Sequence, residues 1–146
     1  MRTSCRFAMA VHVLAVLAYQ EGDLVSSARL AASVNTHPVI IRRLLQALHR
    51  ARLVETRKGA GAGSRLSRAP RRINLAEVFR AVEDGSPFIQ PARKPNAACP
   101  VGHIMRRILD EVFTAARAAL EQELARHTLA HVLAAVKAAG GCRGRG

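Results

Sequence analysis

The side chains of this chain that are best suited to redox or metal chemistry are its cysteines and histidines. Cys99 and His103 are four residues apart, as are His127 and His131, so each pair can lie on one face of a helix. Two ligands are too few to specify a zinc site, which takes a set of roughly four. The spacing therefore predicts surface histidines rather than metal ligands. The chain has three cysteines, none of them in a C-x-x-C pair: Cys5, Cys99 and Cys142.

Cys99 stands directly before Pro100, at the predicted start of a long helix. Backbone N–H groups and the positive end of a helix dipole lower the pKa of a thiol at such a position. An accessible thiol of this kind is readily oxidised to a sulfenic acid or a disulfide, which would make Cys99 a redox switch. The alternative is an inert, half-buried thiol that packs in a dimer core. We expect Cys5 to be structural and Cys142 to be incidental.

No set of residues in the sequence forms a recognisable catalytic constellation. There is no carboxylate pair in an apolar setting, and no Ser/His/Asp order with a supporting motif. The glycine-rich stretch at 59–63 lacks the G-K-[S/T] ending of a phosphate-binding loop, so nucleotide binding is disfavoured. We expect the protein not to be an enzyme. A metal or redox enzyme that uses Cys99 and a histidine is the alternative.

Positive charge is concentrated in one part of the chain. The 146 residues include 23 Lys or Arg against 10 Asp or Glu, a net charge of +13. Residues 42–72 carry ten of these cations and a single acid, which gives this segment a charge of +9. Such a footprint is typical of a surface that neutralises phosphates. Aromatic residues, which stack on the bases of RNA, make up only 3% of the chain, so double-stranded DNA is the favoured partner.

Composition and length favour a helical protein with one aliphatic core. Apolar residues make up 49% of the chain, with alanine and leucine dominant, and this length fits one domain or one domain with an appendage. The N-terminal apolar run, residues 7–19, contains His12 and is too short to span a bilayer. We expect a protein of the reducing cytoplasm, associated with the nucleoid when it is bound to DNA, and without a membrane partner.

The elements that must position these residues are mostly helices. Apolar periodicity predicts helices over 4–19, 28–34, 37–51, 75–83 and 101–127, and a last helix to residue 139. The expected N-caps are Ser4, Ser26 or Ser27, Thr36, Asn74 and Thr128.

The middle of the chain predicts a DNA-binding arrangement. Two short helices with a tight turn, the second of them basic, are typical of a helix-turn-helix. Residues 24–25 form a short strand or a linker. Residues 53–58 and 65–68 then form a two-stranded wing with a flexible tip at 59–64.

Four segments together resemble the Rrf2 family of bacterial winged helix-turn-helix regulators, over residues 1–137. They are NTHPVIIRRLL at 35–45, GAGAG at 59–63, INLAEVFRAVE at 73–83 and NAACPVG at 96–102. The resemblance implies a homodimer that crosses through its long helices and places two recognition helices on a palindromic operator. It implies DNA contacts from two groups of residues. The helix-turn-helix group is Ser27, Ala28, Thr36, His37, Val39, Arg42 and Arg43, and the wing group is Arg57, Lys58, Gly61 and Arg65.

Two departures from the family pattern bear on function. Ala62 and Ser64 stand where the family wing usually has a glycine and a large aromatic residue. Iron–sulfur members carry three closely spaced cysteines in the loop before the long helix, whereas this chain has only Cys99 there. A cluster takes about four ligands and would need Cys5 or His103 as well. The match therefore favours the cluster-free branch, with no cofactor.

The predicted fold is mainly α with a small β-hairpin. It comprises a winged helix-turn-helix domain at 1–84, a sensing or linker loop at 85–100, dimerisation helices at 101–139 and a flexible basic tail at 140–146. The predicted function is a sequence-specific DNA-binding transcriptional regulator, a repressor, with Cys99 as a redox switch and an oxidant or small molecule as effector. The alternatives are a non-specific nucleoid-type DNA binder, an adaptor protein, and the disfavoured iron–sulfur or metal-sensing regulator.

Overall fold

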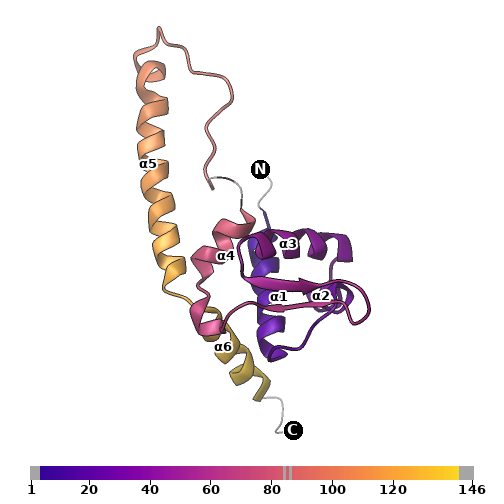
Figure 1. The fold of residues 1–146 in the computed structure, drawn as a ribbon. Coiled ribbons are helices and arrows are strands. Elements are labelled where there is room, and N and C mark those ends of the chain that lie inside the picture. The colour runs from indigo at the N-terminus through magenta and orange to yellow at the C-terminus, as the bar shows by residue number, and fades with distance from the viewer. Residues whose placement is uncertain (1–3, 84, 86, 142–146) are drawn as a thin grey trace.

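The computed structural model describes residues 4–83, 85 and 87–141, and Figure 1 shows their arrangement. Cys142 and the other residues of the predicted tail from 142 to 146 lie outside the described residues, whereas Gly140 and Gly141 belong to the last helix. The elements follow in the order α1 (Arg6–Tyr19), α2 (Ser27–Val34), α3 (Pro38–Arg50), β1 (Val54–Arg57), β2 (Gly63–Leu66), the 3-10 helix η1 (Pro70–Arg72), α4 (Leu75–Val82), α5 (Pro100–Ala125) and α6 (Leu129–Gly141). The predicted fold class, mainly α with one antiparallel hairpin, is confirmed.

One aliphatic core joins the N-terminal helices to the last helix. Leu14 and Leu17 of α1, Leu44 and Leu48 of α3 and Leu129 of α6 are almost fully buried in it. Burial of such a leucine contributes about 1.5–3 kcal/mol relative to an exposed one. The core is therefore complete although the chain has few aromatic residues.

The recognition-type helix α3 begins differently from the prediction. Its N-cap is His37, whose side chain accepts a hydrogen bond from the Val39 N–H, and not Thr36. The Thr36 N–H instead donates to the carbonyl of Ala31 and so completes the end of α2. Similarly, the N-cap residue of α1 is Cys5 and not the predicted Ser4. The Ser4 hydroxyl accepts a hydrogen bond from the N–H of Arg6, the first residue of the helix, and Ser4 lies outside it. The predicted caps Ser26 and Asn74 are confirmed, and Asn74 forms a capping box with Glu77.

The hairpin is shorter than predicted and its second strand starts earlier. Gly63 and Ser64, predicted to lie in the tip, belong to β2, where Gly63 pairs with Arg57. The backbone of Val25 approaches Gly63 so closely that an added Cβ would lie 3.0 Å from it. Val25 and Ser64 form a β-bridge with hydrogen bonds of 2.9 Å in both directions. The missing side chain of Gly63 therefore lets the hairpin attach to the segment before α2.

The last two helices behave differently from each other. In Figure 1, α5 projects away from the rest of the fold, and no residue of α5 is buried. The helix α6 instead packs against α1 and η1, and it continues to Gly141 rather than ending at residue 139. The predicted dimerisation segment, 101–139, thus contains two helices with different surroundings: α5 has no buried residue, whereas α6 packs on the core.

Side-chain contacts hold α5 to its neighbours. Glu121 of α5 forms ion pairs with Arg80 of α4, at 3.3 Å, and with Arg117, at 3.2 Å. The ring of Phe88, in the loop before α5, stacks on Phe113 with centroids 5.1 Å apart. Among the described helices, none is long and apolar enough to cross a membrane.

Candidate nucleic-acid interface

The turn between α2 and α3 produces a helix-turn-helix. Asn35 ends α2 with a left-handed backbone, φ 60°, which asparagine adopts more readily than most residues. Pro38 then occupies the first turn of α3, where its lack of an N–H is tolerated. Two helices meet across this short turn, as the sequence predicts.

Apolar spacing along α3 determines which of its faces is free. Ile41, Leu44 and Leu48 recur at three- and four-residue steps and are buried against the core. Arg42 and Arg43 therefore lie on the exposed side of the helix. This is the face that a recognition helix presents to a DNA groove.

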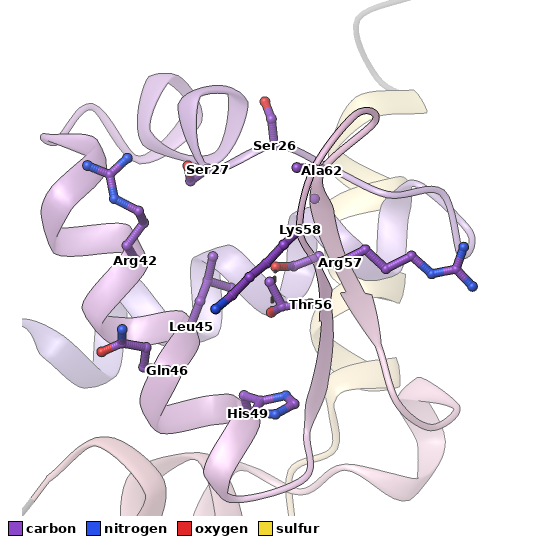
Figure 2. Close-up of a pocket in the computed structure, with 13 residues that line it drawn as sticks. Ser26, Ser27, Arg42, Leu45, Gln46, His49, Thr56, Arg57, Lys58 and Ala62 are labelled. Carbon is purple, nitrogen blue, oxygen red and sulfur yellow. Dashed lines mark hydrogen bonds between the residues drawn. The ribbon is translucent and has the colours of Figure 1, made fainter.

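A groove of about 590 Å³ lies between α3 and the hairpin (Figure 2). Its lining includes two buried residues, Leu45 and Ser64. The hydroxyl groups of Thr56 and Ser64 are hydrogen bonded across the two strands at 3.1 Å. This bond therefore holds together the two strands that form the hairpin side of the groove, opposite α3.

The cations around this groove are not equivalent. Figure 2 shows the Lys58 side chain running from the hairpin toward α3, whereas the guanidinium group of Arg57 points away. Arg42 lines the groove from the α3 side. Within the described part of the chain, no ion pair is formed by these three residues. Arg42 and Lys58 are therefore available to bind an anion in the groove.

The basic segment 42–72 does not form a single surface. Arg65 is paired with Glu55 at 3.0 Å, and Arg68 is paired with Glu77 at the same distance. Arg71 and Arg72 lie on η1, which packs on α6, away from the groove. The cations of this segment are therefore divided, because η1 turns the end of the segment toward α6 and Arg65 and Arg68 are paired with acids.

The structure brings part of the predicted contact set together. Ser27, Arg42, Arg57 and Lys58 border the groove. The remaining positions surround it or lie apart: His37, Val39 and Arg43 are exposed on or beside α3, Ala28 is exposed on α2, Thr36 is half-buried, Gly61 is at the hairpin tip with φ +72°, and Arg65 is half-buried in its ion pair. Their contacts with DNA stay predictions.

Gln46 and His49 line the groove but were not among the predicted DNA contacts. Gln46 and His49 follow Arg42 at four and seven residues, so all three belong to one face of α3. The Nδ1 atom of His49 lies 3.2 Å from the carbonyl oxygen of Val54. A carbonyl only accepts, so His49 donates this bond and ties the end of α3 to β1. Helical spacing from Arg42 could have indicated Gln46 and His49.

Cys99 is the N-cap residue of α5 and is exposed. Hydrogen bonds from the backbone N–H groups of Gly102 and then Val101 hold the pKa of the Cys99 thiol below its usual value. The thiol is exposed in the protomer, and its packing in a dimer core stays a prediction. Cys5, expected to be structural, is exposed as well and is not part of the core.

The donor set of one protomer does not fit an iron–sulfur cluster. Cluster ligation takes about four cysteine or histidine ligands. Over residues 4–83, 85 and 87–141, no three or more His, Cys, Asp or Glu side chains gather in a group that could hold a metal ion. Cys99 and His103 are related only by the bond from the His103 N–H to the Cys99 carbonyl.

Comparisons with known proteins agree with this geometry. A family model named Rrf2 and described as iron-dependent transcriptional regulator matches residues 3–135. The HTH-type transcriptional regulator YwnA of Bacillus subtilis is 38% identical over 128 residues, which cover 88% of this chain and 94% of YwnA. NsrR of Halalkalibacterium halodurans is 30% identical over 115 residues, which cover 77% of this chain and 79% of NsrR.

A solved structure shares both the fold and the sequence pattern. It is a crystal structure described as a DNA-binding protein, with a TM-score of 0.70 and 37% identity, and the match covers 88% of this chain and 98% of that one. The family match spans the helix-turn-helix, the hairpin and α5 together. The chain therefore belongs to the Rrf2 family of DNA-binding transcriptional regulators and is not an enzyme.

Proposed function

We propose that the protein is a homodimeric repressor that recognises a palindromic operator through the exposed face of α3. The observation that carries this proposal is the groove between α3 and the hairpin, with Arg42 and Lys58 on its two sides and neither engaged in an ion pair. Arginine on a recognition helix reads guanine with two hydrogen bonds, worth about 1–3 kcal/mol of discrimination. Lys58 on the hairpin acts on the phosphate backbone, which adds affinity without sequence preference.

The long helix α5 supports the proposed dimer. Val101, Ile108 and Val112 are spaced along one face and are 60%, 44% and 54% exposed. A helix of 26 residues with an uncovered apolar stripe is stabilised when a partner helix covers it. A second copy presents the same stripe, so two α5 helices cover each other, and the two α3 helices are placed on successive half-sites.

The proposed signal is oxidation of Cys99, with no iron–sulfur cluster or other cofactor. The low pKa of the Cys99 thiol favours the thiolate, which attacks peroxide, becomes a sulfenic acid and releases water after proton transfer. A charge or bond change at the start of α5 alters the dimer and therefore the spacing of the two α3 helices. A redox signal of this kind fits a protein of the reducing cytoplasm, where thiols are normally unmodified.

The experiment that tests this proposal is selection of bound genomic fragments by the purified protein, with and without peroxide. We expect one palindrome to be enriched and peroxide to abolish the enrichment. Cys99→Ser is expected to keep the enrichment in both conditions. Enrichment that survives peroxide in the wild type would remove the redox signal, and absence of any enriched sequence would leave a non-specific DNA binder.

A further inference from the structure

A second groove, of about 480 Å³, lies between α5 and the loop that precedes it. Phe88 and Gln90 line it from the loop, and Asp110, Phe113 and Thr114 line it from α5. Asp110 and Thr114 are each two residues from Val112, and residues two apart on a helix face nearly opposite sides. The second groove is therefore on the side of α5 opposite the apolar stripe, and it stays open when a second copy covers that stripe.

One part of the second groove is aromatic. The ring of Phe88 stacks on that of Phe113 with centroids 5.1 Å apart and an interplanar angle of 21°. Phe88 is 46% exposed and Phe113 is half-buried, so both rings keep surface that a ligand can contact. Such rings pack against an apolar body, and their faces attract cations.

The charged residues of the second groove favour a cation. Among the described residues that line it, Asp110 and Glu121 are acids and Arg117 is a base. Glu121 is paired with Arg117 at 3.2 Å and with Arg80 of α4 at 3.3 Å. Asp110 accepts a hydrogen bond from Gln90 and forms no ion pair with any residue that the structure describes. Its carboxylate is therefore the charge left uncompensated in the groove, although the whole chain carries +13.

The hydrogen-bonding groups of the second groove point to the same class of ligand. Nε2 of Gln90 donates to the Arg106 carbonyl at 2.9 Å and to Oδ1 of Asp110 at 3.0 Å, which uses both of its N–H groups. The Thr114 hydroxyl donates to the Asp110 carbonyl at 2.7 Å. These three side chains therefore still offer acceptors: Oδ2 of Asp110, the amide oxygen of Gln90 and the lone pairs of the Thr114 oxygen. A ligand that donates N–H bonds fits them.

We propose that this second groove binds an organic cation with N–H donors and an apolar or aromatic body, such as an arylalkylamine. The ammonium group donates to Asp110, Gln90 and Thr114, and the body packs on the rings of Phe88 and Phe113. The site goes beyond the proposed function, in which oxidation of Cys99 is the signal, and binding to it needs no DNA. The ligand contacts both α5 and the loop that leads to Cys99, so it links the two.

The test is a heteronuclear NMR titration of the full-length protein with phenethylamine, in the absence of DNA. Phenylpropionate, which has a similar body and a negative charge, and phenethyl alcohol, which is neutral, are the comparison ligands. We expect phenethylamine to bind saturably and to shift the side-chain amide signals of Gln90 and the backbone signals of Phe113 and Thr114. The comparison ligands should bind at least about tenfold more weakly, because hydrogen bonds between charged partners are the stronger ones.

Asp110→Asn keeps an oxygen that accepts from Gln90 but removes the charge. We expect it to weaken phenethylamine binding about tenfold and to abolish the preference over phenethyl alcohol. Asp23→Asn is the matched control, because it makes the same change at another exposed carboxylate, outside the second groove. Its affinity for phenethylamine should equal that of the wild type.

Three outcomes would overturn the proposal: no saturable binding of phenethylamine to the wild type, equal affinity for phenylpropionate, or equal affinities of Asp110→Asn and Asp23→Asn for phenethylamine. Failure of the proposed function is a separate result, because it appears in the selection of genomic fragments, in which no amine is present.

Discussion

The carbonyl oxygen of Asn96 lies against the α-carbon of Gly102, in space that any side chain at position 102 would have to enter. The same oxygen accepts a hydrogen bond from the Cys99 N–H at 3.2 Å, and the Asn96 side chain accepts from the Ala98 N–H at 2.9 Å. Residues 96–99 are thereby folded onto the first turn of α5. This close approach brings the Cys99 thiol next to the amides of Val101 and Gly102.

Gly102→Ala is expected to displace this loop. The new methyl group would overlap the Asn96 carbonyl, and overpacking of this kind costs about 1–3 kcal/mol of unfolding free energy. The alkylation rate of Cys99 at neutral pH should fall because its amide contacts are lost. Gly140→Ala is the control, since a Cβ there meets nothing within 4 Å. Equal stability and equal alkylation rates in the two variants would contradict the proposed role of Gly102.

The lowered pKa of Cys99 predicts a specific pH profile of thiol reactivity. Hydrogen bonds from Gly102 and Val101 stabilise the thiolate, so more thiolate is present below the usual thiol range. In a Cys5→Ser, Cys142→Ser background, the alkylation rate of Cys99 should reach half its maximum at a lower pH than free cysteine, whose pKa is about 8.5. A midpoint at or above the value of free cysteine would show that the amides do not act on the thiol.

Replacement of the arginines of α3 should remove sequence preference rather than general affinity. Arg42→Ala and Arg43→Ala are each expected to reduce the ratio of palindrome to random-duplex affinity, by about 1–3 kcal/mol where the arginine contacts a guanine. Competition binding with the two duplexes measures this ratio. If neither substitution changes it, the exposed face of α3 is not the reading surface.

Arg57 and Lys58 offer a matched pair on the hairpin. Both are cations, but only the Lys58 side chain runs toward α3. Lys58→Ala should weaken binding to every duplex about equally and lower the salt slope by about 0.9, whereas Arg57→Ala should leave the slope close to that of the wild type. Identical slopes for the two variants would mean that the hairpin reorients on DNA.

The exposed apolar stripe of α5 predicts that a charged substitution within it prevents dimer formation. Val112→Asp places a charge in the stripe and is expected to give a monomer in analytical ultracentrifugation, because burial of an unpaired carboxylate is unfavourable. Thr114→Asp, on the opposite side of the helix, is expected to stay dimeric. A monomeric wild type would remove the dimer from the proposed function.

The sequence predicted elements better than contacts, for physical reasons visible at particular residues. Periodicity located α3 and α5 because apolar spacing follows directly from helix geometry. It misplaced Gly63 and Ser64, which pair with β1 and are also attached to Val25, almost forty residues earlier, because pairing over such a distance leaves no local pattern. It could not separate Lys58 from Arg57, or foresee that Glu77 pairs with Arg68, because side-chain direction depends on the folded hairpin and on η1.

His37 and Cys99 show the same limit of sequence-based prediction at the functional site. Both were selected by position and type, and both have their chemistry determined by backbone amides that only the structure locates. Their exposure likewise depends on the loops around them.

The attachment of α5 to the helical core near its C-terminal end has a mechanical consequence. Its C-terminal end is held by the bridge between Asn74 and Thr128 and by Leu129 in the core, whereas Cys99 is at the far end of 26 helical residues. At about 1.5 Å per residue the helix is a lever arm of about 39 Å. A tilt of a few degrees near residues 126–128 moves the Cys99 end of α5 by several ångströms. Conversely, a force on the Cys99 end produces a torque on the part of α5 that lies beside α4. The shape of this protomer therefore provides leverage between the Cys99 end of α5 and α4.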